Sequence, residues 1–474
     1  MKDKQNVIYW FRRDLRLLDN PALSEAANAG PILPIFIFDE LQTDYTQGSA
    51  SQWWQNQSLN SLNNQLSNRL LIFSGDPKEI ILELAKASNS KTVYWNRCYD
   101  PWQIELDSKI EIILNAEKIY TITRNGSLLW EPWTTLKKDG TPYKVFTPYF
   151  KKRCLSLPEP RKPIPKPSNL IFANISKKTA TKGNFIFPKE DNWEKKIKKY
   201  WLIGEKAAAN KLDDFSKSGI ISYKEGRNYP SKNNISMLSP HLHFGEISPN
   251  KIWHRVRSNV QSEDSAHFLS ELGWREFSYN LLYYFPQLPK NNLQTKFDRF
   301  PWGYNSEHLK KWQNGITGYP IIDAGMRELW ETGFMHNRLR MITGSFLVKN
   351  LLIHWHHGKE WFWNCLVDAD LASNSASWQW VAGCGADAAP YFRIFNPITQ
   401  GQKFDPSGEY TRKFVPELRN LPDKYLFTPW EAPSELLDNS GIKLGKDYPY
   451  PIVDLKSSRE LALNAYSFIS KKQC

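Results

Sequence analysis

Short apolar runs alternate with amphipathic segments through the first 135 residues, and this alternation constrains the fold more than any other feature. Five runs predict buried strands, at 7–10, 32–38, 70–73, 92–95 and 119–122, and the segments 21–29, 52–67, 77–87 and 104–115 predict helices. Strands joined by helices pair in parallel, because a parallel crossover needs a connection of helix length. We therefore predict a doubly wound α/β domain over residues 1–135, with ligands beyond the carboxyl ends of its strands.

The remainder of the chain changes character twice. Residues 136–200 are rich in proline, lysine and serine, which predicts a long connector running over the surface. Beyond residue 200 helical periodicity dominates, most clearly at 266–284, 320–331, 336–352 and 360–367. We predict a mainly α-helical domain over residues 201–474.

The net charge of +13 points to a polyanionic partner, but its distribution limits that inference. Residues 151–200 hold fourteen Lys and Arg against four Asp and Glu, a net of +10 that leaves +3 elsewhere. Most of the charge therefore belongs to the connector. A nucleic-acid interface must come from local arginines outside it.

Cysteine usage and hydropathy indicate the cellular setting. The five cysteines are scattered and form no C-x-x-C pair, which is typical of a reduced intracellular protein without disulfides or a cysteine zinc site. The N-terminus lacks the apolar core of a signal peptide, and no run approaches the roughly 18 apolar residues of a membrane span. We expect a soluble, cytoplasmic monomer.

Residues 368–380 include two acids, an amide and two indoles at Asp368, Asp370, Asn374, Trp378 and Trp380. An ordinary core favours Leu, Ile and Val, because an indole is hard to bury fully and its N–H needs a partner. This mixture suits a buried, flat, redox-active ligand. The alternative is an aromatic-rich helical core whose few polar groups are satisfied internally.

Three further patterns could serve such a ligand. Helical spacing puts Glu271, Trp274, Arg275 and Ser278 near one face and predicts an ion pair between Glu271 and Arg275. A second helical face carries an amide and two guanidiniums, from Asn337, Arg338 and Arg340. The hydroxyl-bearing turn at 236–240 either binds a phosphate through backbone N–H groups or is a plain helix N-cap.

Two patterns favour structure over chemistry. Residues 383–388 fit G-x-G-x-x-A, but they follow helical sequence rather than a strand, so a nicotinamide-dinucleotide site is disfavoured. The histidines at 241, 243, 354, 356 and 357 have no nearby acid or cysteine at a zinc spacing. We predict no metal site.

The chain resembles DNA photolyases and cryptochromes along nearly its whole length. The resemblance rests on motifs at 10–17 (Trp-Phe-Arg-Arg-Asp-Leu-Arg-Leu), 270–277, 317–324, 336–340 and 368–380. It implies that the helical domain holds FAD in a folded conformation. Trp378, Trp355 and Trp302 match the family's chain of three tryptophans, which carries an electron from the surface to photoexcited flavin.

By this resemblance, eleven positions bind FAD: Tyr223, Ile235, Ser236, Met237, Leu238, Ser239, Arg275, Arg340, Asp368, Asp370 and Asn374. The turn's hydroxyls lie near the phosphates, and Arg340 pairs with Asp368 beside the isoalloxazine. Asp370 lies against the ring's polar edge and Asn374 near its reactive nitrogen. The family usually has Thr where this chain has Ile235, so one hydroxyl donor is missing.

A few positions separate the sub-families. Pyrimidine–pyrimidone (6-4) photolyases carry histidines at the positions of Asn337 and Met341 and Gln at that of Glu271, and this chain has none of these. DASH cryptochromes have a smaller ring than Trp380, and plant and animal cryptochromes replace Asn374 with Asp or Cys. The resemblance therefore implies a cyclobutane pyrimidine dimer photolyase. A blue-light-sensing cryptochrome without repair activity is the alternative.

The resemblance also implies contacts to UV-damaged DNA. Trp274 and Trp380 provide flat apolar walls for the flipped-out dimer, while Glu271 and Asn337 bond its polar groups. With Met341, these are the expected catalytic residues. Contacts to the DNA around the dimer are expected from Arg227, Arg338, Arg393, Gln400 and Lys403.

The N-terminal domain is expected to hold an antenna chromophore that passes energy to FAD. Its segment 99–105 departs from the folate-binding pattern, because Trp102 and Gln103 stand where that pattern has Asn and Glu. The missing carboxylate removes an acceptor for the pterin, and Trp102 either stacks on a ring or blocks the pocket. Methenyltetrahydrofolate, a deazaflavin and an empty site stay open, with the folate slightly ahead.

Overall fold

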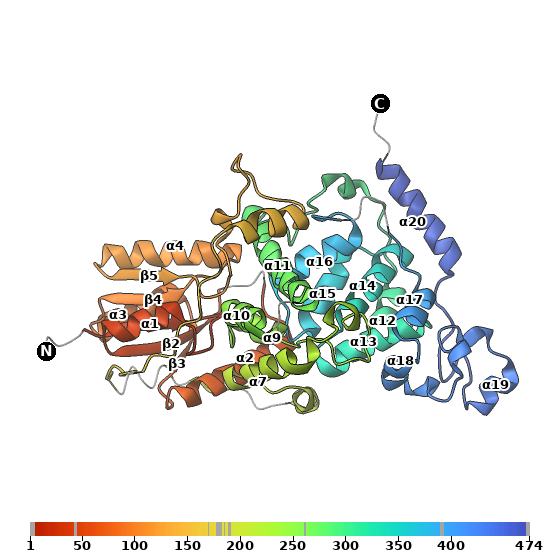
Figure 1. Ribbon diagram of the computed structural model, residues 1–474, viewed down its shortest axis with the longest axis horizontal. Helices are drawn as coiled ribbons and strands as arrows, with labels where there is room; N and C mark the ends of the chain where they lie inside the picture. The colour runs from red at the N-terminus through yellow and green to blue at the C-terminus, as the bar shows by residue number, and fades with distance from the viewer. Residues whose placement is uncertain are drawn as a thin grey trace. The chain divides into compact units, whose positions relative to one another are not determined.

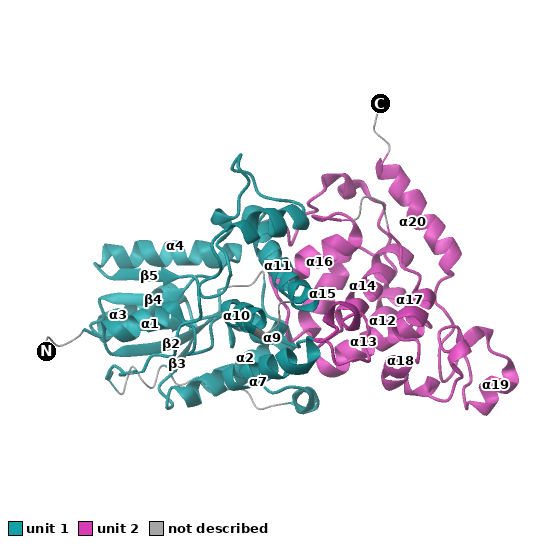
Figure 2. Ribbon diagram, in the orientation of Figure 1, with its two compact units in different colours: residues 1–220, 236–286 teal, residues 221–235, 287–474 magenta. Residues whose placement is uncertain are grey.

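The computed structural model describes residues 5–41, 45–168, 170–176, 183, 185–187, 191–259, 262–388 and 393–470. Contacts divide the chain into two compact units, shown in Figure 2. Unit 1 comprises residues 1–220 and 236–286, and unit 2 comprises residues 221–235 and 287–474. The domain boundaries predicted at 135 and 200 stay predictions, because contact density alone does not define a domain.

A five-stranded parallel sheet forms the N-terminal part of unit 1 (Figure 1). Its strands are β1 (Val7–Phe11), β2 (Ile32–Asp39), β3 (Leu71–Gly75), β4 (Thr92–Asn96) and β5 (Tyr120–Arg124), in the order β3-β2-β1-β4-β5. The crossovers contain α1 (Pro21–Ala29), α2 (Ser49–Gln65), α3 (Pro77–Ala87) and α4 (Pro101–Ala116). The predicted doubly wound fold is confirmed, and its strand order reverses between β1 and β4.

Local sequence explains where these elements begin. Asn20 caps α1 by accepting from the N–H of Leu23 at 3.2 Å, and Asp76 caps α3 by accepting from the N–H of Lys78 at 2.9 Å. A proline follows each cap, where its missing N–H costs nothing. Every residue of β1 is buried, as expected for a parallel strand covered on both faces.

The motif at 10–17 folds into a buried polar network beyond β1. Asn96 Nδ2 donates to Asp14 Oδ2 at 2.7 Å, and the hydroxyl of Tyr9 lies within hydrogen-bond distance of Asp14 Oδ2 and, at 2.7 Å, of Asn20 Oδ1. Arg16 is 1% exposed and donates to the backbone carbonyls of Leu18, Asp19, Gly126 and Gly245. The motif therefore connects separate segments of unit 1, because its side chains bond to residues elsewhere in the same unit.

The connector extends the sheet as well as running over the surface. The N–H of Ile32 donates to the carbonyl of Ile171 at 2.7 Å, and the N–H of Ala173 donates back to Ile32 at 2.8 Å. The N–H of Ile72 likewise donates to Gly183 at 2.8 Å. The predicted surface course is right only in part, because these bonds satisfy backbone groups at the starts of β2 and β3.

Helices dominate the rest of both units, which confirms the predicted helical region. Unit 1 adds α6 (Asn192–Ile197), α7 (Glu205–Asp214), α9 (Ser239–His243), α10 (Pro249–Asn259) and α11 (Glu263–Tyr284). Unit 2 contains α8 (Tyr223–Gly226), α12 (Ser306–Gln313), α13 (Pro320–Thr332), α14 (Asn337–Ser345), α15 (Trp355–Cys365), α16 (Leu371–Ala382), α17 (Pro397–Phe404), α18 (Glu409–Phe414), α19 (Ser434–Asn439) and α20 (Leu455–Ser470).

The helix predicted at 336–352 is wrong in its length. It begins at Asn337, because His336 is the N-cap, and α14 ends at Ser345. A π-helical turn, η7 (Phe346–Asn350), follows and closes with a bond from the N–H of Leu351 to the carbonyl of Phe346. A π-helical turn is formed by i→i+5 bonds, so 3.6-residue periodicity does not reveal where α14 ends.

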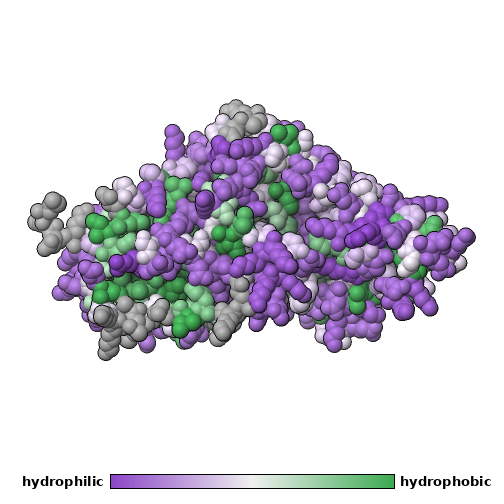
Figure 3. Space-filling model, turned by 90° about the horizontal axis from the view of Figure 1, so that it is seen from below, coloured by the Kyte–Doolittle hydropathy of each residue, from purple (hydrophilic) through white to green (hydrophobic). Residues whose placement is uncertain are grey.

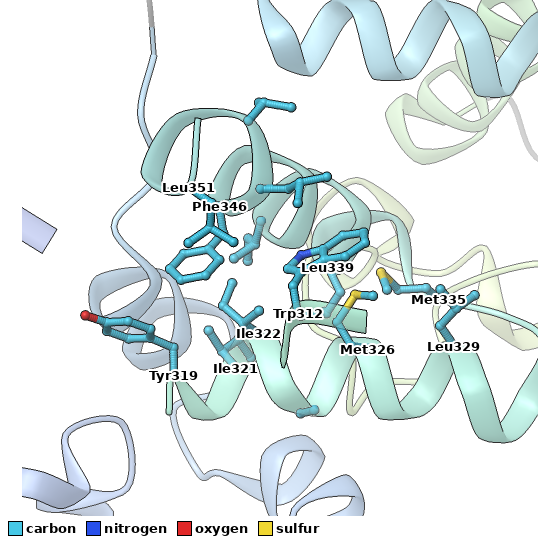
Figure 4. Packing of buried hydrophobic residues seen from close by; sticks show 14 of the residues in the cluster. Trp312, Tyr319, Ile321, Ile322, Met326, Leu329, Met335, Leu339, Phe346 and Leu351 are labelled. Carbon is cyan, nitrogen blue, oxygen red and sulfur yellow. The ribbon is translucent and has the colours of Figure 1, made fainter. Parts of the chain in front are cut away.

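Aromatic and aliphatic side chains from α12, α13, α14 and η7 form part of the core of unit 2 (Figure 4). The indole of Trp312 is fully buried, and its N–H donates to the carbonyl of Thr343 at 3.0 Å. Leu339, Met326 and Phe346 belong to the same cluster. This packing fixes α14, which carries several of the predicted site residues.

The surface shown in Figure 3 is mostly hydrophilic. Hydrophobic residues gather there over the part of unit 1 that carries the sheet. Within the described ranges, every helix is too short or too polar to cross a membrane.

Candidate functional site

Arg340 and Asp368 form the predicted ion pair in unit 2. Arg340 Nη2 lies 2.9 Å from Oδ2 and 3.1 Å from Oδ1 of Asp368, and its Nε donates to the carbonyl of Met335 at 2.7 Å. Asp368 is 8% exposed, and burying a carboxylate is costly unless a partner pairs with it and hydrogen-bonds to it. The pair therefore fixes charge at a defined place near the start of α16.

Asp370 and Asn374 lie one helical turn apart at the start of α16. Asp370 is the N-cap and accepts from the N–H of Ser373 at 2.9 Å. Asn374 donates through Nδ2 to the carbonyl of Lys359 at 3.1 Å. Both side chains are buried and share one side of the helix, which gives that side the acid and amide chemistry assigned to the flavin ring.

The predicted phosphate turn lies in unit 1. Met237 has a φ of 53°, a left-handed conformation that non-glycine residues adopt at a cost. The N–H of Leu238 lies 3.4 Å from Ser236 Oγ, and Ser239 begins α9. Ile235 is half-buried beside the turn and has no hydroxyl to add. Strained turns of this kind expose N–H groups to anions, whereas α9, with five residues, contributes little dipole.

Three cations of unit 2 gather on aromatic rings, and we call them the cationic cluster: Arg227, Arg338 and Lys403. The guanidinium of Arg338 lies 4.2 Å from the ring centre of Phe404, and Lys403 Nζ lies 5.4 Å from it. The guanidinium of Arg227 lies 5.5 Å from the ring centre of Tyr223, which is buried. Lys403 is exposed and the arginines are half-buried, so the cluster is accessible to an anionic ligand.

Burial and nearby positive charges, two of them from this cluster, lower the pKa of His336. Burial, followed by the charges of Arg227, Arg338 and Arg340, lowers the pKa of His336 to about 3. Its Nδ1 accepts from the N–H of Arg338 at 3.2 Å as the N-cap of α14. The imidazole is therefore neutral at physiological pH, and α14 depends on it staying so.

The other predicted DNA and dimer contacts of unit 2 differ in exposure. Asn337 is exposed at the first position of α14, while Met341 and Gln400 are half-buried. Arg393 is exposed, and its carbonyl accepts from the ammonium of Lys349. Burial, followed by the charge of Arg393, lowers the pKa of Lys349 to about 7.

The three tryptophans matched to the electron-transfer chain all lie in unit 2. Trp378 and Trp355 are buried, whereas Trp302 is half-buried. The ring of His354 lies 5.0 Å from that of Trp302 and 5.6 Å from that of Trp355. The N–H of Trp355 donates to Asn292 Oδ1 at 3.0 Å. Trp302 is the most exposed of the three, as the surface end of such a path requires, and the path itself stays a prediction.

The polar face of α11 differs from its prediction. Arg275 Nη1 lies 3.1 Å from Glu276 Oε1 and donates to the carbonyl of Ser127 at 2.8 Å, so the predicted pair with Glu271 is wrong. The buried Glu276 is the better partner, because its other oxygen already accepts from the N–H of Leu129 at 2.7 Å. Burial raises the pKa of Glu276 to about 7, and Arg275 opposes that shift. Arg275 is thus tied to unit 1's own backbone.

Two residues that the sequence reasoning missed hold Arg338 in place. Asn228 accepts from Nη2 of Arg338 through its Oδ1, and Phe404 lies beneath the guanidinium. Each is a sequence neighbour of a predicted cation, Arg227 or Lys403. That adjacency was the available signal, although chain position alone does not show which cation each one contacts.

The G-x-G-x-x-A pattern set aside on sequence grounds has a structural role. Gly383 adopts a φ of 95° as the C-cap of α16, so the G-x-G-x-x-A segment closes a helix instead of following a strand. The carbonyl of Asp387 in that segment accepts from the indole N–H of half-buried Trp380 at 3.1 Å. Among described residues, no three His, Cys, Asp or Glu side chains are grouped as metal ligands.

Comparison with known proteins agrees with this geometry. Residues 7–168 match the DNA photolyase family, and residues 268–468 match the FAD binding domain of DNA photolyase. A deoxyribodipyrimidine photo-lyase of Agrobacterium fabrum is 45% identical over 98% of both chains. Cryptochrome-1 of Arabidopsis thaliana is 37% identical over 95% of this chain and 69% of its own.

Comparison with a solved structure agrees with the sequence matches. The crystal structure of a bacterial class III photolyase from Agrobacterium tumefaciens superposes with a TM-score of 0.93 at 44% identity, covering 100% of this chain and 99% of that one. Matches of this extent include both the sheet and the helices of unit 2. The chain belongs to the DNA photolyase family, whose FAD-binding domain it carries, and it is an enzyme of that family.

Proposed function

We propose that this enzyme repairs cyclobutane pyrimidine dimers in DNA under blue light. The observation that carries the proposal is the surface of α14, where Asn337 is exposed and Met341 half-buried beside the cationic cluster. An amide and a thioether there suit the neutral carbonyl edge of a dimer and replace the histidines expected for (6-4) products. The carboxyl of Glu271 on α11 supports the same choice.

We propose FAD as the cofactor, bound by the eleven positions named above. The donor set fits: Asp370 and Asn374 supply acid and amide groups, the Arg340–Asp368 pair supplies fixed charge, and the left-handed turn at Met237 supplies backbone N–H groups. When bound, excited reduced FAD supplies the electron that splits the dimer and takes it back, so no net redox change results. Trp302, Trp355 and Trp378 would keep the cofactor reduced.

The protein's own residues bind and orient the dimer. A dimer weakens pairing, so flipping it out of the duplex costs less than flipping a normal base. Trp274 and Trp380 supply apolar contacts to the joined rings, and Glu271 and Asn337 bond their polar edges. Arg227, Arg338, Arg393, Gln400 and Lys403 hold the flanking backbone, which makes affinity salt-dependent.

Repair of a defined oligonucleotide tests the proposal. Chemically reduced holoenzyme should convert a thymine-dimer strand to intact thymines in blue light and not in the dark, and should leave a (6-4) product unchanged. Trp380→Ala should lower dimer binding, whereas Trp330→Ala, on an exposed indole of α13, is the control. Intact dimers after illumination of a protein that still photoreduces would instead identify a light-sensing cryptochrome.

We propose an antenna chromophore in unit 1, with methenyltetrahydrofolate ahead of a deazaflavin or an empty site. Trp102 stacks on Tyr45 with ring centres 4.9 Å apart, and Gln103 Oε1 accepts from Arg12 Nη1 at 2.9 Å. Both substituted positions are thus engaged within unit 1, and an aromatic pair of this kind can accept a flat ring. Mass spectrometry of pigments from protein made in its native host decides, and FAD alone would contradict the antenna.

We further propose that the enzyme acts as a monomer in the cytoplasm. Scattered, reduced cysteines support this setting, and the four that the structure describes are free and buried. Light scattering of the holoenzyme tests the monomer against a mass of 55.3 kDa. A dimer at micromolar concentration would contradict it.

A further inference from the structure

Three aromatic rings are stacked at the side of α11. Phe146 lies parallel to Trp274, with ring centres 3.9 Å apart and planes 10° from each other. Phe150 continues the stack on Phe146, at 5.5 Å and 9°. Phe277 closes one edge of the indole, 5.8 Å away and at 75°. The plane of Trp274 is therefore defined by neighbours on one face and one edge.

The chain is built to permit this stack. A Cβ atom at Gly273 would lie 2.4 Å from the ring of Phe150, so only glycine lets that ring approach α11. Phe150 belongs to the π-helical turn η2 (Pro148–Arg153), and Phe146 lies just before it. Phe146 and Phe150 are 8% and 4% exposed, whereas Trp274 is half-buried. The buried part of the indole is the face that meets Phe146.

Such an arrangement favours ligand binding to the accessible part of the indole. An indole free to rotate loses entropy when a flat ligand stacks on it, and a ring already held in place loses less. Burying one face against Phe146 also leaves the indole in one orientation. Plain core packing explains the burial of Phe146 and Phe150 but not why a half-exposed tryptophan tops a parallel stack.

We propose that Phe146 is a positioning residue for damaged DNA: it sets the plane in which Trp274 meets the dimer. The inference rests on the proposed function and deepens it, because Trp274 is there a direct dimer contact. Phe146 itself touches no substrate. Its effect must therefore pass through the indole, and that requirement makes it testable.

The experiment is a double-mutant cycle on dimer binding by the holoenzyme. Phe146→Leu keeps an apolar side chain but removes the flat face, and should weaken affinity for a thymine-dimer duplex about two- to tenfold, as a lost aromatic pair predicts. Affinity for the undamaged duplex should not change. Phe146→Tyr retains the ring and should stay within about twofold of the parent.

In a Trp274→Ala background, Phe146→Leu should cause no further loss of dimer affinity. Phe268→Leu is the matched control, because Phe268 is a similarly buried phenylalanine of α11 whose ring packs on Phe215, which is not part of the stack. Equal losses from Phe146→Leu with and without Trp274 would overturn the inference and indicate general destabilisation. So would unchanged dimer affinity in Phe146→Leu.

These outcomes are distinct from failure of the proposed function. If the parent does not repair dimers, or if Trp274→Ala binds them normally, the proposed dimer contact is wrong. If Trp274→Ala loses affinity while Phe146→Leu does not, the contact stands and the positioning role is wrong. FAD content of each variant, read from its absorbance, should equal that of the parent in every case.

Discussion

Two family motifs, one in each unit, have opposite structural characters. In unit 1 the motif at 10–17 is buried: Asp14 and Arg16 are 1% exposed and hydrogen-bonded to other residues of that unit. In unit 2 the motif at 336–340 begins with a buried cap, His336, and then presents the exposed Asn337. Equal recognisability thus does not mean an equal structural role: the first motif is buried and paired within its unit, whereas the second presents an exposed polar side chain.

The motif at 317–324 belongs with the structural group although it lies in unit 2. The buried carboxylate of Asp323 accepts from the N–H and hydroxyl of Thr317 at 2.7 and 2.6 Å and from the N–H of Gly318 at 3.1 Å. The hydroxyl of Tyr448 adds a fourth bond at 2.7 Å. Asp323 therefore joins the start of α13 to the C-terminal region, and the contrast follows burial rather than unit.

Substitution of the buried arginine should give the largest effect. Arg16→Met should lower the free energy of unfolding by at least about 3 kcal/mol, because four carbonyls, three of them buried, lose their donor. Arg338→Met, on a half-buried arginine, should cost less than about 1 kcal/mol. Urea unfolding followed by circular dichroism measures both. Similar costs for the two substitutions would break the comparison.

Acid should destabilise unit 2 through two histidine N-caps. His336 and His354 both accept a backbone N–H through Nδ1 as N-caps, and burial lowers their pKa values to about 3 and about 4. Since the ordinary value is 6.5, the unfolded chain binds protons first as pH falls. The stabilisation is therefore complete above about pH 6.5 and is lost as pH falls toward the folded pKa.

The matching variant keeps the cap but removes the titration. His336→Asn should make unfolding less pH-dependent by about 2 kcal/mol between pH 7 and pH 5, with little change at pH 7. Denaturant midpoints across that range provide the measurement. A variant with the parent's pH dependence would show that protonation of this cap does not destabilise α14.

Much of this contrast between the motifs could not be predicted from the sequence. Hydrophobic periodicity and turn residues predicted the starts of all five strands to within two residues. Asn20 and Asp76 cap two of the helices between these strands. The partners in the networks are far apart in the chain: Arg16 meets Gly245, and Phe146 meets Trp274. No local periodicity encodes such pairs, so the motif at 10–17 was recognisable without its role being readable.

Local rules also failed where tertiary burial supplied a better partner. Spacing favoured Glu271 as the partner of Arg275, yet the guanidinium pairs with the adjacent, buried Glu276. An exposed pair four residues apart contributes only about 0.3–0.5 kcal/mol, which is easily outweighed. The pair of Arg340 with Asp368 was predicted correctly because it came from resemblance rather than from spacing.

Substitutions within the cationic cluster test its proposed contact with DNA phosphates, and their effects should be of intermediate size. Arg338→Ala should reduce the slope of log affinity against log salt by about 0.9, the contribution of one phosphate contact. Phe404→Leu keeps every charge and should leave that slope unchanged while weakening binding about two- to fivefold, through loss of the ring under Arg338. Titrations of dimer-containing duplex at several salt concentrations distinguish them. A changed slope in Phe404→Leu would contradict the assignment.

Removing lysines from the connector should have the smallest effect, and this tests whether net charge or its placement governs DNA binding. Lys195, Lys196 and Lys199 are exposed on and after α6, in the segment that carries most of the chain's excess charge. Exposed charges distant from a ligand are screened within about 8 Å at physiological salt. The triple change to Gln should therefore leave the salt slope within about 0.3 of the parent and dimer affinity within about twofold, although it removes three positive charges. If it reduced the slope as much as Arg338→Ala does, the connector would be part of the DNA interface, and the assignment of the phosphate contacts to the cationic cluster would need revision.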